Sequence, residues 1–392
     1  MSRVEVPGSE PAAPRYGEAS LTEVTPSILS ALGVAGTPNT LEVEAAGAVC
    51  LLVVDGLGWV QLRAHPDQAP FLNALAARGR AITTGFPSTT VTSLGSIGTG
   101  LPPGRHGLVG YTLGLPGYER PVNLLAWGFL DGGIQVDLRA ELPPEDFQPE
   151  RTSFERAADT GLPVTVLGAR EHRGSGMTRA VLRGGTFTAV YSAGDVAAMV
   201  LAALRAGRGG LVYAYHANLD VTGHIRGVDS ESWALELGAA DRLAETIAER
   251  LPRGAVLAVT GDHGMVDVAE DRKVDLSGRP DLLDGVRQVA GEPRARYVYA
   301  VPGAEADVLA AWRESLGDAM WIRSRDQAIG AGWFGPAVPD RIRPRIGDVV
   351  AAAHEPMGVF RRDQEGLLFR LIGHHGSLTP TEVLVPFLTT KR

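Results

Sequence analysis

The sequence predicts an α/β protein with a central, mostly parallel β-sheet, helices on both of its faces and a small α/β cap insertion. Two observations support this fold class: short, continuous apolar runs that end in polar or glycine-containing segments, and helical patterns between those runs. Continuous apolar runs are typical of strands that are buried on both faces. Strands that alternate with helices place those helices on both sides of the sheet.

Each element can be placed along the chain. The expected strands lie within residues 48–58, 162–170, 210–220 and 254–264, and the helices within 69–79, 91–100, 195–207 and 231–251. Residues 1–25 are rich in Pro, Gly and Glu and are expected to form a flexible leader, followed by one domain over residues 26–392.

Two insertions interrupt the alternation. Residues from about 111 to 150 are rich in Pro and Gly and contain several aromatic side chains. Residues from about 275 to 345 include a helical pattern over 305–317 and are expected to form the cap. Arg294 and Arg296 could reach the substrate from this insertion, but we expect them to lie on a solvated strand face.

Composition narrows the class of partner. The chain has 392 residues, of which 44% are hydrophobic, and a formal net charge of −8. This charge argues against a nucleic-acid scaffold, which requires clustered Lys and Arg. The single cysteine, Cys50, lies in an apolar run and is expected to be buried. The N-terminus lacks the apolar stretch of a signal peptide and no run could span a bilayer, so we expect a cytoplasmic protein; the oligomeric state is left open.

Acidic and imidazole side chains follow the strands at the edge where parallel α/β sheets bind ligands. These residues are Asp55, Asp220, His224, Asp262, His263, His374 and His375. Each has an ordinary alternative: an Asp commonly caps the next helix, an Asp–His pair can form a turn, and the last two histidines can be surface residues. Carboxylates crowded at one edge without a cation would repel one another. Three carboxylates and three imidazoles are a ligand set that zinc accepts, and they divide into two sites of three.

The segment 85–100 contains seven hydroxyl side chains and almost no charge. Such hydroxyls can be loop residues or helix caps. One of them can instead be a nucleophile, because metal coordination activates an alcohol that is otherwise weakly nucleophilic.

Five motifs occur in an order that resembles one known family. They are VVDGLG, GLPPGRHGL, D-x-x-x-H, TGDHGM and GHHG, and they span Asp55 to His375. The set resembles the type I phosphodiesterase / nucleotide pyrophosphatase family of the alkaline phosphatase superfamily. A sulfatase assignment fits poorly, because the sequence around Cys50 lacks the required C/S-x-P-x-R motif.

The resemblance implies two metal sites and a nucleophile. Asp55, Asp262 and His263 correspond to the first site, and Asp220, His224 and His375 to the second, with His375 preferred over His374 because it directly precedes a glycine. Two divalent cations are implied, with Zn²⁺ expected and Mn²⁺ as the alternative.

Counting back ten residues from Gly100, as the family pattern requires, gives Thr90 as the nucleophile, with Thr89 as the alternative. Thr90 could instead be only the N-cap of the helix that follows, although a helix N-terminus also attracts phosphate. Family members often carry an asparagine that contacts a phosphate oxygen. In this chain Ser93 occupies the corresponding position, and we expect its hydroxyl to contact the phosphate oxygen in place of the asparagine.

The implied activity is hydrolysis of a small phosphoester, most simply a phosphodiester, through a phosphothreonine intermediate. The alternatives are a phosphomonoesterase, a phosphonate hydrolase or a phosphomutase that uses the same metals, and a metal-binding protein that has lost catalysis. The sequence does not name the substrate.

Overall fold

The computed structural model describes residues 10–131, 134–206 and 209–392, and these form a domain around a seven-stranded sheet with the order β2-β19-β10-β1-β9-β7-β8. All strands run in the same direction except β19, which is antiparallel to β10 and β2. The predicted fold class is confirmed. The strands are β1 (Ala48–Val54), β2 (Arg80–Thr83), β7 (Val164–Gly168), β8 (Thr186–Ala189), β9 (Gly210–His216), β10 (Ala255–Gly261) and β19 (Leu384–Lys391).

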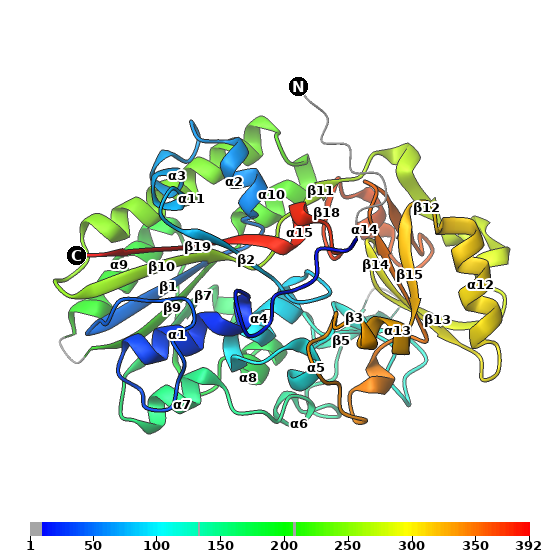
Figure 1. Ribbon diagram of the computed structural model, residues 1–392, viewed down its shortest axis with the longest axis horizontal. Helices are drawn as coiled ribbons and strands as arrows, with labels where there is room; N and C mark the ends of the chain where they lie inside the picture. Colours follow the sequence, from blue (N-terminus) through cyan, green and yellow to red (C-terminus); the bar gives the residue numbers. More distant parts are fainter. Residues whose placement is uncertain (1–9, 132–133, 207–208) are drawn as a thin grey trace.

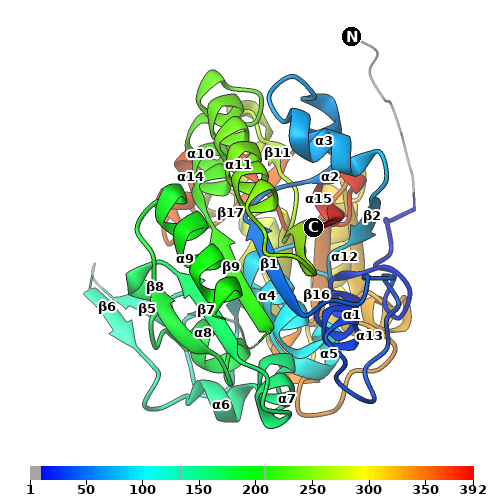
Figure 2. The same cartoon turned by 90° about the vertical axis from the view of Figure 1, so that its left-hand side faces the viewer.

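Helices cover both faces of this sheet (Figures 1 and 2). One face carries α2 (Trp59–Ala64), α3 (Pro70–Ala76), α9 (Ala193–Arg205) and α11 (Glu231–Glu249); the other carries α1 (Val24–Ala31), α4 (Thr90–Thr99), α7 (Ser153–Asp159) and α8 (Gly176–Val181). Strand β1 shows why its sequence is apolar throughout: Val49 and Leu51 face one hydrophobic core, whereas Cys50 and Leu52 face the other. Cys50 is fully buried, as expected.

The two insertions form small sheets of their own. The first contains β3 (Thr112–Leu113), β4 (Val122–Asn123), β5 (Gly128–Asp131) and β6 (Ile134–Asp137), followed by α6 (Pro144–Phe147). The cap, on the right of Figure 1, has the strand order β13-β14-β16-β15. Its strands are β13 (Val286–Glu292), β14 (Ala295–Ala300), β15 (Met320–Ser324) and β16 (Val349–Ala353), with helices α12 (Glu305–Leu316) and α13 (Arg325–Gly330). The cap therefore extends beyond the expected boundary near 345, because β16 pairs with both β14 and β15.

The N-terminal segment is more ordered than the expected leader over residues 1–25. Residues 1–9 lie outside the described part of the chain. Within the segment that is described, Leu21 and Val24 are completely buried, and Ser20 and Glu23 form a reciprocal capping box at the first helical turn. The burial of these apolar side chains and the two hydrogen bonds of the capping box hold this part of the segment against the domain.

The cap is joined to the rest of the domain by two buried arginines. Arg294 donates from Nε and Nη2 to the Glu382 carboxylate at 2.7 and 2.8 Å, on α15 (Pro380–Val383). Arg296 donates from Nη1 to Glu365 at 2.8 Å, just before α14 (Gly366–Arg370). The expectation of a solvated strand face is therefore wrong, because both guanidinium groups are buried with acidic partners that lie about 70 to 90 residues away in sequence.

No helix in the residues that the structure describes is long and apolar enough to cross a membrane.

Candidate metal centre and nucleophile

Three adjacent parallel strands bring the predicted acidic residues to one edge of the sheet. Asp55 directly follows β1, and Asp262 directly follows β10. Asp220 lies in the first turn of α10 (Asn218–Arg226), which follows β9. Because β9, β1 and β10 are neighbours and run parallel, their carboxyl ends meet at the same place.

The histidines reach this edge from three different elements. His263 follows Asp262, and His224 lies one helical turn after Asp220 on α10. His375 follows β18 (Gly373–His374), a short strand paired with β11 (Val266–Asp267).

These side chains form two clusters that could each hold a metal ion. The first ligand group is Asp55, Asp262 and His263, and the second ligand group is Asp220, His224 and His375; within each group the ligand atoms lie within 4.8 Å of one another. The two groups touch, because the rings of His263 and His375 stack with centroids 3.6 Å apart at 15°. The structure thus brings together all six predicted ligands.

Each imidazole is oriented by its second nitrogen. The Nδ1 atoms of His224, His263 and His375 lie 2.7, 3.0 and 2.9 Å from main-chain carbonyl oxygens. A carbonyl oxygen can only accept, so Nδ1 carries the proton in the neutral ring and Nε2 keeps a free lone pair. This arrangement is the usual support for a histidine that binds metal through Nε2.

The carboxylates lack partners on the side where a cation would bind. Asp55 Oδ1, Asp220 Oδ1 and Asp262 Oδ2 are buried and have no hydrogen-bond partner among the described residues. Burial and the nearby charges of Asp220 and Asp262 raise the pKa of Asp55 well above its usual range. Because unpaired buried carboxylates are costly, these oxygens fit a bound divalent cation in each group.

Thr90 lies next to the first ligand group. It is the first residue of α4, and its Oγ1 is 3.2 Å from Nε2 of His263. Thr89, the alternative nucleophile, is the N-cap residue and makes no side-chain capping bond. The interpretation of Thr90 as only the N-cap therefore does not match its position, and Thr90 is the hydroxyl placed against a ligand.

Ser93 and His374 lie outside this arrangement. The Ser93 hydroxyl donates to the main-chain oxygen of Asp262 at 2.6 Å and is fully buried, so it supports the loop that carries a ligand. It is not among the residues that line the cavity at the site, and the phosphate contact expected for Ser93 stays a prediction. His374 faces the Leu371 main-chain oxygen at 3.2 Å and is not part of the second ligand group.

Two further residues at the site were not predicted from the sequence. The Tyr215 hydroxyl donates to Asp55 Oδ2 and fixes that carboxylate. Glu292, at the tip of the β13–β14 hairpin, lines the same cavity as Thr90, and its side chain is buried. The alternating tyrosines of the strand 210–216 could have indicated that Tyr215 lies at the site. The position of Glu292 at the site could not be predicted, because it depends on how the cap packs against the domain.

The fold and its site were compared with known proteins. A family model described as type I phosphodiesterase / nucleotide pyrophosphatase matches residues 49–127 and 134–378. Human ectonucleotide pyrophosphatase / phosphodiesterase 5 superposes with a TM-score of 0.65 at 18% identity, covering 87% of each chain. The murine protein, as an inactive variant in complex with AMP, gives 0.63 at 17% identity and the same coverage. Phosphonoacetate hydrolase from Sinorhizobium meliloti 1021, in complex with phosphonoformate, gives 0.64 at 22% identity, covering 87% of this chain and 89% of that one. No curated protein sequence matches significantly.

The sheet, its helices and its cap therefore have the fold of these solved structures. More narrowly, the chain belongs to the type I phosphodiesterase / nucleotide pyrophosphatase family, and it is an enzyme of the phosphoester hydrolase class.

Proposed function

We propose that this chain hydrolyses phosphodiesters, with Thr90 as the nucleophile and two divalent cations, zinc in the first instance, held by the two ligand groups. The observation that carries the proposal is the position of Thr90 Oγ1, 3.2 Å from Nε2 of His263 in the first ligand group. A hydroxyl beside a metal-ligand group is where an activated nucleophile would be required.

The chain's own residues account for the two steps. Thr90 Oγ1 loses its proton to solvent and attacks phosphorus, the bond to the departing alkoxide breaks, and that alkoxide takes up a proton from solvent and leaves as the alcohol. Water then attacks the phosphothreonine, releases the phosphate monoester and restores the threonine hydroxyl. When bound, the two cations would stabilise the charge on the phosphoryl oxygens and lower the pKa of the attacking group. The free amide groups at the N-terminus of α4 favour an anion at the same place.

The charge balance favours a diester over a monoester. Three ligand carboxylates and two dications would leave about one net positive charge, which matches the single charge of a diester. Among the residues described as lining the cavity, Arg139 is the only Lys or Arg, and it is already paired with Asp137. A dianionic monoester would therefore lack a cationic side chain to neutralise its second charge.

The test compares two threonines of the same helix. Thr90→Val should reduce turnover of bis-p-nitrophenyl phosphate by more than about 10³-fold while metal content stays unchanged. Thr92→Val is the matched control, because the Thr92 hydroxyl is also on α4 but has no hydrogen-bond partner among the described residues. Normal turnover in Thr90→Val would remove Thr90 from the mechanism. Faster hydrolysis of p-nitrophenyl phosphate or phosphonoacetate than of the diester by the wild type would favour the monoesterase or the phosphonate hydrolase.

A further inference from the structure

The hydroxyl-rich segment 85–100 contacts the loops of both ligand groups, on either side of Thr90. Ser88 lies two residues before Thr90, and Ser93 lies three residues after it on α4. Both serine side chains are completely buried, and each hydroxyl group forms its hydrogen bonds with a loop that carries a ligand. The segment that presents the nucleophile is therefore bonded directly to both halves of the metal centre.

Ser88 binds the loop that carries His375 through both its main chain and its hydroxyl group. His375 Nδ1 lies 2.9 Å from the Ser88 main-chain oxygen, and the Ser88 N–H donates to the main-chain oxygen of Gly376 at 3.0 Å. The Ser88 hydroxyl donates to the main-chain oxygen of Ser377 at 2.7 Å and accepts from the Gly376 N–H at 3.2 Å. Because the hydroxyl uses both its donor and its acceptor on the two residues after His375, it fixes the main chain that carries this ligand.

The same loop is held from its other side by the cap and α15. The Ser377 N–H donates to Glu382 Oε1 at 3.0 Å, and this carboxylate also binds Arg294 of the cap. The Ser377 hydroxyl donates to the main-chain oxygen of Ala353 at 2.5 Å. Since these contacts fix the loop relative to the cap, the bonds from Ser88 are what fix it relative to the nucleophile.

Ser93 has the corresponding position at the first ligand group. Its hydroxyl donates to the main-chain oxygen of Asp262 at 2.6 Å. Asp262 Oδ1 in turn accepts from the main-chain N–H groups of Gly56 and His263, both at 3.0 Å. Gly56 directly follows Asp55, so the bond from Ser93 holds the residue around which the other two ligands of this group are arranged.

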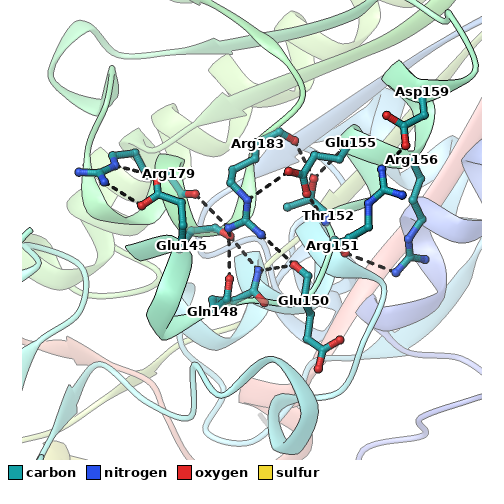
Figure 3. Close-up of polar contacts among 11 residues, drawn as sticks. Glu145, Gln148, Glu150, Arg151, Thr152, Glu155, Arg156, Asp159, Arg179 and Arg183 are labelled. Carbon is teal, nitrogen blue, oxygen red and sulfur yellow. Dashed lines mark hydrogen bonds and ion pairs between the residues drawn. The ribbon is translucent and has the colours of Figure 1, made fainter. Parts of the chain in front are cut away.

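Helix α4 is itself held in place by its neighbours. It packs against α8 so closely that a Cβ atom at Gly98 would lie 2.2 Å from the main-chain oxygen of Val181. A polar network fixes α8 in turn (Figure 3). Arg183, directly after α8, donates to the Glu155 carboxylate of α7 at 3.3 Å and to the main-chain oxygen of Glu150 at 2.9 Å. A helix supported in this way can hold the loops that it contacts at a defined place.

We propose that Ser88 and Ser93 are positioning residues for the two cations: Ser88 serves the second ligand group and Ser93 serves the first. The segment that carries Thr90 then sets the place of both cations relative to its own nucleophile. The inference rests on the proposed function for the presence of two cations, and it assigns one serine to each. The bonds from the two hydroxyl groups to the main chain of the ligand-bearing loops carry it.

The experiment measures zinc affinity by chelator competition in full-length proteins that each keep one intact ligand group. Asp220→Ala removes a ligand of the second group, and Asp55→Ala removes a ligand of the first. In the Asp55→Ala protein, Ser88→Ala should weaken zinc binding about 10-fold, whereas Ser93→Ala should leave it unchanged. In the Asp220→Ala protein the two serine variants should exchange these effects.

Ser96→Ala is the matched control in both proteins. Ser96 is equally buried on α4, and its Oγ lies 3.3 Å from Nε2 of His106, which belongs to neither ligand group. Its replacement should leave zinc affinity unchanged. A serine that only satisfies buried polar groups would behave like Ser96. Loss of affinity at neither group, or an equal loss at both, would therefore overturn the assignment of the serine concerned.

Cysteine variants keep the test open if an alanine variant does not fold. Ser88→Cys and Ser93→Cys nearly preserve the shape of the side chain but replace a hydroxyl by a weak donor. Co²⁺ bound to the same single-group proteins gives a visible absorption spectrum that depends on the geometry of its ligands. The spectrum should change only with the serine that serves the remaining group, and an unchanged spectrum would contradict that role.

Zinc affinity separates this inference from the proposed function, because its measurement needs no turnover. The crossed pattern of losses, found in a chain whose wild type does not hydrolyse bis-p-nitrophenyl phosphate, would support the two serines and remove the phosphodiesterase. Hydrolysis by the wild type without the crossed pattern would keep the hydrolase and overturn the positioning roles.

Discussion

Replacement of Glu292 by glutamine should change how the stability of the protein depends on pH. Burial raises the pKa of Glu292 from its ordinary 4.5 to about 8, and its nearest opposing charge, Arg296, is already bound to Glu365. The carboxyl group is therefore protonated in the folded protein and ionised in the unfolded chain between these two values. Unfolding releases a proton in this window, so the contribution of Glu292 to stability falls as pH rises.

The size of the effect follows from the two pKa values. Each pH unit between 4.5 and about 8 removes about 1.4 kcal/mol from the free energy of unfolding, or roughly 5 kcal/mol over the whole window. Glu292→Gln keeps the shape and cannot ionise, so its stability relative to the wild type should rise by that amount from pH 4.5 to pH 8.

Urea unfolding at pH 5, 6, 7 and 8 measures the difference. The protein should be metal-free, because cations bound nearby would themselves favour the ionised carboxylate. Glu314→Gln, an exposed glutamate on α12, controls for the loss of one surface carboxyl group. A difference between Glu292→Gln and the wild type that stays constant with pH would refute the reasoning.

Three further predictions concern the cations and the cap. Asp220→Ala should lower the metal content measured by mass spectrometry from two ions per chain to about one, and an unchanged count would contradict the second ligand group. Tyr215→Phe should weaken metal affinity about 10- to 100-fold in chelator competition, since it removes the hydrogen bond that fixes an oxygen of Asp55. Tyr213→Phe is the control and should leave the affinity unchanged, because the Tyr213 hydroxyl has no hydrogen-bond partner among the described residues. Equal affinities of the two variants would show that the Tyr215 hydrogen bond has no such role. Arg294→Met should cost about 3–5 kcal/mol of stability by leaving the Glu382 carboxylate buried and unpaired, a loss that chemical denaturation would detect.

The central sheet and the ligand set could be predicted because their signals are local. Each predicted acidic residue follows a buried apolar run, and a parallel sheet necessarily brings such strand ends together. Asp55 and Asp262 are therefore neighbours although 206 residues lie between them. The main-chain N–H of Gly56, the residue after Asp55, also donates a hydrogen bond to Asp262 Oδ1.

What the sequence did not show depends on contacts made only after folding. Arg294 and Arg296 look like an exposed alternation, and only the docking of the cap against Glu382 and Glu365 buries them. Ser93 lies on the expected helix, but its hydroxyl donates a hydrogen bond to the Asp262 main-chain oxygen, which no spacing rule reveals.

The buried pair of Arg294 and Glu382 limits how the enzyme can admit its substrate. Swinging the cap outward would pull two opposite charges apart inside the protein. We therefore expect the cap to stay in place during turnover. Substrate is then expected to enter past the first insertion, where the exposed side chains of Leu125 and Gln135 line the cavity.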